Sequence, residues 1–236
     1  MILDMNIQDQ ITDFERNNKH VAISYGGDGT LLRTFHENPD KSIIPIRNYG
    51  MCEKHIGLLN DVLNGTKTCK SELKLYLADL LECDDHKAIS EIQMTSADPT
   101  CCLRFDVNIN GKLYMENVIA NGFIMATRLG STGYFKSVAR TIFRDGYGLG
   151  FICPTYGINN VVLKSTDWIS IEFKRDCDVY LCFDHLKYQH TFKVGDKKKF
   201  WLSSDHASLF GYEEFMCHEC RKGRNSTILN DQYQIV

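Results

Sequence analysis

Apolar and polar positions follow two different patterns along the chain, and the first pattern occupies roughly residues 1–67. Within residues 7–17 the apolar positions fall at i, i+4 and i+7, which predicts an amphipathic helix. Residues 21–25 form an apolar run that stops at two glycines, which predicts a buried strand and a tight turn. A second helix is expected from Thr30 and a second strand over 43–46. This order of elements is typical of an α/β fold.

Beyond residue 67 short runs alternate apolar and polar positions, as in half-buried strands. Alternating runs cover 103–109, 161–163, 169–173 and 179–183. The dipeptide Asn110-Gly111 is a strong hairpin signal between such runs. One helix is expected over 131–143. We therefore predict an α/β N-terminal lobe over 1–67 and a β-rich, sandwich-like C-terminal lobe over 68–212.

Composition and charge exclude several classes of protein. The 236 residues include 27 lysines and arginines and 30 aspartates and glutamates, so the net charge of −3 gives no reason to expect nucleic acid or an anionic membrane as partner. No apolar run approaches the ~18 residues of a membrane span. The N-terminus lacks a signal-peptide pattern, so we expect a cytoplasmic protein.

The ten cysteines show no regular spacing, and we interpret them as free thiols. One CxxC motif, formed by Cys217 and Cys220 around His218, leaves a metal site as a minor alternative. The basic residues 221–224 that follow it are expected to be solvated or to lie at an oligomer edge.

A glycine-rich turn, Gly26-Gly27-Asp28-Gly29-Thr30, lies between the first strand and the second helix. Glycines allow a phosphate to approach backbone N–H groups, and the start of a helix favours an anion. Asp28 in this turn can contact a metal ion or accept a proton from a hydroxyl group. A structural turn with a solvated aspartate is the alternative. The Walker A pattern is absent.

A second strand–turn–helix segment contains Gly130-Ser131-Thr132-Gly133. By itself, a Ser or Thr in such a turn is more often a helix cap than a ligand contact.

Together and in this order, the two turns resemble those of the NAD kinase family. Residues 88–92 look like the ALNE segment of that family, Asn121-Gly122 lies where the family has Asp-Gly, and 127–134 lies where it has TPTGSTAY. Further similar segments are 105–111, 158–160 and 183–186. The resemblance spans about residues 20–210. The GGDGT motif is also shared with lipid kinases, but the later β-rich part favours NAD kinase.

The resemblance implies transfer of a phosphoryl group from ATP, or from polyphosphate, to the 2′-hydroxyl of the adenosine ribose of NAD, with Mg²⁺ or another divalent cation. Asp28 is the implied catalytic residue, acting as base or metal contact. The implied phosphate-binding residues are Gly27, Gly29 and Thr30. The implied NAD-binding residues are Ser90, Glu91, Asn121, Thr132, Tyr134, Ser137, Asp184 and His185. The resemblance also implies a C-terminal tail, 213–236, that returns to the first lobe, and a homodimer or homotetramer. No resident metal site is assigned.

The sequence departs from the family pattern around the implied pocket. Ser90 replaces an Asn, Asn121 replaces an Asp, and Arg128-Leu129 replaces Pro-Thr. These changes keep two alternatives open. One is a catalytically impaired module that binds NAD(P) or a related nucleotide, and the other is a kinase for another hydroxyl group, on a lipid or a different nucleoside.

Overall fold

A computed structural model describes residues 2–48, 53–65 and 72–216 of the chain. It divides into two compact units, one formed by Met1–Tyr76 with Ser208–Val236 and the other by Leu77–Ala207. The sequence pattern places these junctions after residues 67 and 212. No turn signal marks the observed junctions, because the strands β3 (Leu75–Cys83) and β13 (Lys197–Phe210) each carry the chain across one of them.

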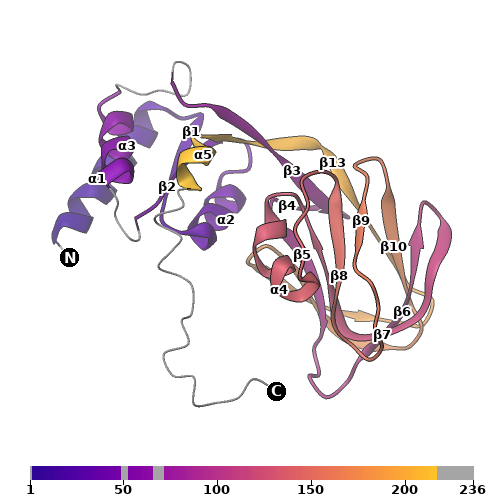
Figure 1. Cartoon of the computed structure of the whole chain (residues 1–236). Helices are drawn as coiled ribbons and strands as arrows, with labels where there is room; N and C mark the ends of the chain where they lie inside the picture. Colours follow the sequence, from indigo (N-terminus) through magenta and orange to yellow (C-terminus); the bar gives the residue numbers. More distant parts are fainter. Residues whose placement is uncertain (1, 49–52, 66–71, 217–236) are drawn as a thin grey trace, which may run out of the picture. The chain divides into compact units, whose positions relative to one another are not determined.

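The first unit is the predicted α/β element series. Its elements are α1 (Ile2–Asn17), β1 (Val21–Tyr25), α2 (Asp28–Glu37), β2 (Ser42–Ile46), α3 (Glu53–Leu63) and α5 (Tyr212–Phe215). Strands β1 and β2 are parallel, and β2 also pairs with the end of β13. Alternate side chains of β1 and β2 form a core with α1 and α3, while α2 contacts the pair from its other side (Figure 1).

The second unit is β-rich, as the alternating pattern predicts. Its further strands are β4 (His86–Ala88), β5 (Glu91–Ser96), β6 (Leu103–Ile109), β7 (Lys112–Ala126), β8 (Tyr147–Pro154), β9 (Val161–Leu163), β10 (Trp168–Phe173), β11 (Cys177–Phe183) and β12 (Leu186–Phe192). They pair in the order β13-β10-β6-β7-β5-β11-β12, and β8 and β9 extend from β7. Figure 1 shows this curled sheet. In its main core Phe123 contacts the rings of Phe105 and Phe200.

The expected hairpin at Asn110-Gly111 is confirmed, since both residues have positive φ angles, 51° and 78°, as this turn requires. The expected helix over 131–143 is wrong in length. A 3₁₀ turn over Gly130–Thr132 and a short helix α4 (Tyr134–Ala139) replace it. The helix ends early because Arg140 adopts a left-handed conformation, with φ at 55°.

Three further sequence predictions concern the start of α2, the C-terminal residues and membrane spans. Helix α2 begins at Asp28, two residues before the expected Thr30. The CxxC motif, the basic residues 221–224 and the tail from residue 217 lie outside the described residues. No helix in the described part of the chain combines the length and the apolarity needed to cross a bilayer.

Candidate functional site

The glycine-rich turn of the first unit joins the carboxyl end of β1 to the amino end of α2. Gly26 donates its backbone N–H to the carbonyl of Ile46, at 2.8 Å, which ties the turn to β2. A Cβ atom on Gly26 would lie 2.1 Å from Oγ1 of Thr30, so only glycine fits there. Gly29 is exposed, and a Cβ on it would meet nothing within 4 Å. The first glycine therefore shapes the turn, while the last keeps its surface open.

The amino end of α2 carries the features of an anion site. Gly27 is the N-cap residue, and no side chain of the described residues caps this end. The first N–H groups of a helix have no intrahelical partner, and the helix dipole places positive charge there. In a helix of 10 residues, this end offers donors that suit phosphate oxygens.

Asp28 stands in the first turn of α2 and forms an ion pair with Arg47. Its Oδ1 accepts a hydrogen bond from Nη2 of Arg47 at 2.8 Å. The two side chains differ sharply in exposure, 55% for Asp28 and 1% for Arg47. The carboxylate thus faces solvent, while the cation that holds it is buried.

In the second unit a carboxylate organises the turn over residues 89–91. Asp184 Oδ2 accepts the N–H of Ile89 at 3.0 Å, and its Oδ1 accepts those of Ser90 and Glu91 at 2.9 and 3.0 Å. The N–H of Asp184 donates in return to the carbonyl of Glu91, at 2.9 Å. Asp184 tolerates its φ of 53° because aspartate enters the left-handed region more readily than most residues. This clamp fixes the backbone that carries Ser90 and Glu91.

A second set of bonds attaches the Gly130 turn to the same segment. Thr127, which is fully buried, donates its hydroxyl to the carbonyl of Ile89 at 2.7 Å, and its N–H to that of Ser90 at 2.9 Å. A Cβ on Gly130 would lie 2.1 Å from the carbonyl oxygen of Ser90, so the two turns touch at backbone level. A Cβ on Gly133 would be 3.9 Å from a carboxylate oxygen of Glu91. The turns after β4 and after β7 therefore form one polar surface.

Glu91 is the most perturbed carboxyl group of this surface. Burial raises its pKa to about 7, and the negative charge of Asp184 adds to the rise. The pKa of the nearby Tyr134 is also raised, first by burial and then by the charges of Cys153 and Glu91. Groups with shifted pKa values that lie together often mark functional sites.

Comparisons with known proteins find relatives of similar sequence. The chain is 28% identical to the NAD kinase of Latilactobacillus sakei over 198 residues, covering 73% of this chain and 71% of the relative. It is 26% identical to NAD kinase 1 of Bacillus subtilis over 217 residues, covering 80% of each. No protein-family model matches the chain.

Solved structures show the same fold. Yeast NADH kinase complexed with NADH aligns with a TM-score of 0.70 and 17% identity, covering 90% of this chain and 68% of that one. An NAD kinase from Archaeoglobus fulgidus in complex with ATP aligns with a TM-score of 0.64 and 19% identity, covering 88% and 85%. The chain is thus similar to NAD kinases in sequence over most of its length, and it shares their fold.

The residues predicted from the NAD kinase resemblance fall into separate groups. Gly27, Asp28, Gly29 and Thr30 belong to the first unit, and all the predicted NAD-binding residues belong to the second. Within the second unit, the structure brings together Ser90, Glu91, Thr132, Tyr134 and Asp184, through the two joined turns. Ser137 lies on an exposed side of the short α4, and His185 is exposed beside Asp184.

Asn121 lies apart from the other predicted NAD-binding residues of the second unit. It precedes Ala126, the partner of Glu91 in the sheet, by five residues of β7, or about 16 Å. Its Oδ1 accepts a hydrogen bond from Sγ of Cys102 at 3.3 Å. Cys102 lines a cavity of about 320 Å³ whose wall includes Cys101, Cys177, Arg175 and Lys193.

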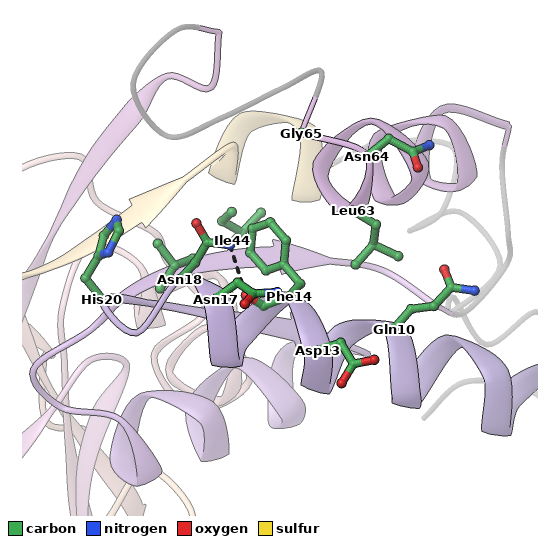
Figure 2. A pocket seen from close by; sticks show the side chains of 11 residues that line it. Gln10, Asp13, Phe14, Asn17, Asn18, His20, Ile44, Leu63, Asn64 and Gly65 are labelled. Atoms are coloured by element: carbon green, nitrogen blue, oxygen red, sulfur yellow. Dashed lines mark hydrogen bonds between the residues drawn. The ribbon is translucent and has the colours of Figure 1, made fainter.

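A cavity in the first unit, larger than the one beside Cys102, is lined by none of the predicted NAD kinase residues. Figure 2 shows this cavity of about 680 Å³, bordered by α1, the start of β1 and the end of α3. Phe14, Ile44 and Leu63 supply apolar surface, and Asn17 and Asn64 supply amides. It lies at the end of β1 that holds Val21, opposite the glycine turn.

Sequence reasoning missed Arg47 and the bonding role of Thr127. A signal for Arg47 was present, because it follows the apolar strand over 43–46 directly. Carboxyl ends of neighbouring parallel strands meet at one sheet edge, so a charged residue there belongs beside the glycine turn.

Proposed function

We propose that the protein is an NAD kinase, which transfers a phosphoryl group from ATP to the 2′-hydroxyl of the adenosine ribose of NAD and forms NADP. Its curated relatives carry the name NAD kinase. Two structures with its fold are described as complexes with NADH and with ATP. The observation that carries the proposal is the open amino end of α2 with the exposed carboxylate of Asp28, in a chain that also has the clamped Ser90–Glu91 turn.

In the first unit, the proposed roles follow from the amino end of α2. Gly27 and Gly29 bind phosphate oxygens of the donor through their N–H groups, and Thr30 does so through its hydroxyl, because its N–H already donates to the carbonyl of Gly27 at 3.1 Å. Asp28 accepts the proton of the attacking hydroxyl group or contacts the cation that accompanies ATP.

Mg²⁺ or another divalent cation is proposed to arrive with ATP. Among the described residues no group of three or more His, Cys, Asp or Glu side chains is placed to hold a metal ion. Mg²⁺ commonly binds through substrate phosphates and only one or two carboxylates, a requirement that Asp28 fits. The cation would neutralise phosphate charge during the transfer.

In the second unit, Glu91 is proposed to accept hydrogen bonds from ribose hydroxyl groups, and Ser90 to face the adenine. Tyr134 and Thr132 would border the same surface, with Ser137 and His185 at its edge. Asp184 would act through the backbone it clamps. Asn121 is proposed to contact the nicotinamide side of NAD. Its distance of about 16 Å along β7 from Ala126, the sheet partner of Glu91, makes this role the one that most needs a test.

The decisive experiment incubates purified protein with NAD, ATP and Mg²⁺ and detects NADP with an NADP-specific dehydrogenase. The wild type is expected to form NADP, and Asp28→Asn to lose at least about 100-fold in rate. Asp13→Asn is the matched control, because Asp13 also pairs with an arginine but both partners are exposed. A reaction with polyphosphate in place of ATP identifies the donor. Sedimentation of the same protein tests the proposed homodimer or homotetramer.

Nucleotide binding without transfer is the second candidate function. The departures from the family pattern at Ser90, Asn121 and Arg128 favour it, since they change the residues implied for the NAD pocket. NAD binding by calorimetry, with no NADP from either donor, would support this candidate and contradict the first. Phosphorylation of a lipid or another nucleoside, but not of NAD, would contradict both.

A further inference from the structure

Arg47 is held by three contacts that belong to the first unit. Its Nε donates to the backbone carbonyl of Phe215 at 2.7 Å, and its Nη2 donates to Asp28 at 2.8 Å. Its guanidinium carbon lies 4.0 Å from the centre of the Phe215 ring, which is a cation–π distance. The side chain thus links the short C-terminal helix α5 to the first turn of α2.

The burial of Arg47 makes these contacts necessary. With a side-chain exposure of 1%, the guanidinium has lost nearly all its water, and a buried cation requires a charge partner and hydrogen bonds. Nη1 has no hydrogen-bond partner among the described residues. The carboxylate of Asp28 and the carbonyl of Phe215 are therefore the two acceptors that fix the orientation of the guanidinium group.

Other charged and titratable groups surround this pair. His55 on α3 is buried, and its pKa is lowered by burial and then by the charge of Arg47. Glu214 on α5 acts on the pKa of His55 in the opposite direction. Neither ring nitrogen of His55 has a hydrogen-bond partner among the described residues, so His55 does not replace Asp28 as the acceptor for Arg47.

We propose that Arg47, anchored by Phe215 of α5, is a positioning residue that sets the orientation of the Asp28 carboxylate for phosphoryl transfer. The inference rests on the proposed function. It extends that function because it makes residues 212–215, distant in sequence from the glycine turn, part of the apparatus that holds Asp28. A guanidinium can donate from Nε and Nη2 at once in fixed directions, whereas an ammonium group cannot reproduce this fork.

The test compares Arg47→Lys, Arg47→Met and Phe215→Leu in the complete chain. We expect kcat for NADP formation to fall at least 10-fold in Arg47→Lys and further in Arg47→Met, while the KM for NAD stays within 2-fold. Phe215→Leu keeps the backbone carbonyl and removes only the ring, so a smaller fall in kcat is expected. Arg16→Lys, in an exposed pair, is the matched control and should leave kcat unchanged. A kcat of folded Arg47→Lys within 2-fold of wild type would overturn the proposal.

A second measurement separates this inference from the proposed function. Urea unfolding is followed for wild type, Asp28→Asn, Arg47→Met and the double variant. Asp28→Asn should lower the midpoint of the wild type, but should change that of Arg47→Met far less, because the buried cation is then already gone. Equal shifts in both backgrounds would overturn the inference even in an active enzyme. An inactive wild type that shows the unequal shifts would contradict the proposed function, and with it the role in phosphoryl transfer, but would keep Arg47 as the residue that holds Asp28.

Discussion

Glu91 and Asp184 show how neighbouring carboxyl groups take different roles from their surroundings. Asp184 accepts hydrogen bonds from three backbone N–H groups, which hold the turn over residues 89–91. Glu91 is desolvated beside the charge of Asp184, so its pKa rises to about 7. Asp184 therefore supports the turn, and Glu91 remains a carboxyl group whose charge changes near neutral pH.

Substitution of Glu91 by Gln is expected to change how stability depends on pH. The pKa of Glu91 is about 7 in the folded chain against an ordinary 4.5. The folded chain therefore binds this proton more tightly than the unfolded chain, and the resulting stabilisation of the folded state is complete below pH 4.5. The effect is lost as pH rises from there through 7, and the loss amounts to at most about 3 kcal/mol of unfolding free energy. In Glu91→Gln this loss is absent, so the variant should gain stability relative to the wild type as pH rises from 5 to 8.

Urea unfolding of both proteins at pH 5, 6, 7 and 8 measures this difference. Glu116→Gln is the control, since Glu116 is exposed in the same unit and should leave the pH profile unchanged. Parallel profiles for wild type and Glu91→Gln would show that Glu91 is not desolvated in solution.

At the level of single residues, the sequence indicates candidate ligand contacts but not the bonds that hold them in place. It singles out Asp184 as a ligand contact, and the structure adds that its carboxylate accepts backbone N–H groups of residues 89–91. Such bonds join residues more than 90 positions apart, so nothing local reveals them. For Arg47 a local signal is present, since it directly follows an apolar strand, but its partner Phe215 is 168 residues away and is not revealed by the sequence.

At the level of elements, those with local signals are predicted and the others are not. The strand β1, its glycine turn and α2 follow from an apolar run that stops at glycines. The strand β13 begins with three lysines, Lys197–Lys199, and depends on pairing with β10, so its alternation is hidden. The helix expected over 131–143 is too long because the left-handed Arg140 carries no glycine signal.

Two glycines of the same turn are expected to respond oppositely to alanine. Gly29→Ala should leave stability unchanged or slightly raised, because its Cβ meets no atom within 4 Å and alanine favours a helix. It should raise the KM for ATP at least 5-fold, since the Cβ would occupy the open end of α2 where we propose that phosphate binds. Gly26→Ala should instead destabilise by about 1–3 kcal/mol, because its Cβ would overlap Thr30.

Steady-state kinetics and urea unfolding of the two variants check this contrast. Gly57→Ala on α3, where a Cβ also meets nothing within 4 Å, controls for the effect of alanine alone. An unchanged KM for ATP in Gly29→Ala would remove the amino end of α2 from the proposed donor site.

At the level of the whole molecule, the proposed ligands are assigned to different units. The phosphate donor is assigned to the turn over 26–30 and the dinucleotide to segments 89–91 and 127–134. The chain passes between the units only through β3 and β13, so each unit keeps its own core. The two binding events can therefore be mapped separately along the chain.

Hydrogen exchange followed by mass spectrometry should resolve these two footprints. NAD alone is expected to slow exchange in 89–91 and 127–134, and ATP with Mg²⁺ alone to slow it in 26–31, because bound ligands reduce local opening. The variant Glu91→Gln is the control. In it, NAD should protect residues 89–91 less than in the wild type, while ATP with Mg²⁺ should still protect residues 26–31. If ATP protects residues 26–31 but NAD does not protect residues 89–91, the protein is a kinase that uses another phosphoryl acceptor. If NAD protects residues 89–91 in a protein that forms no NADP, the protein binds the nucleotide without transfer. The second unit would then retain its ligand without the transfer that Asp28 is proposed to support.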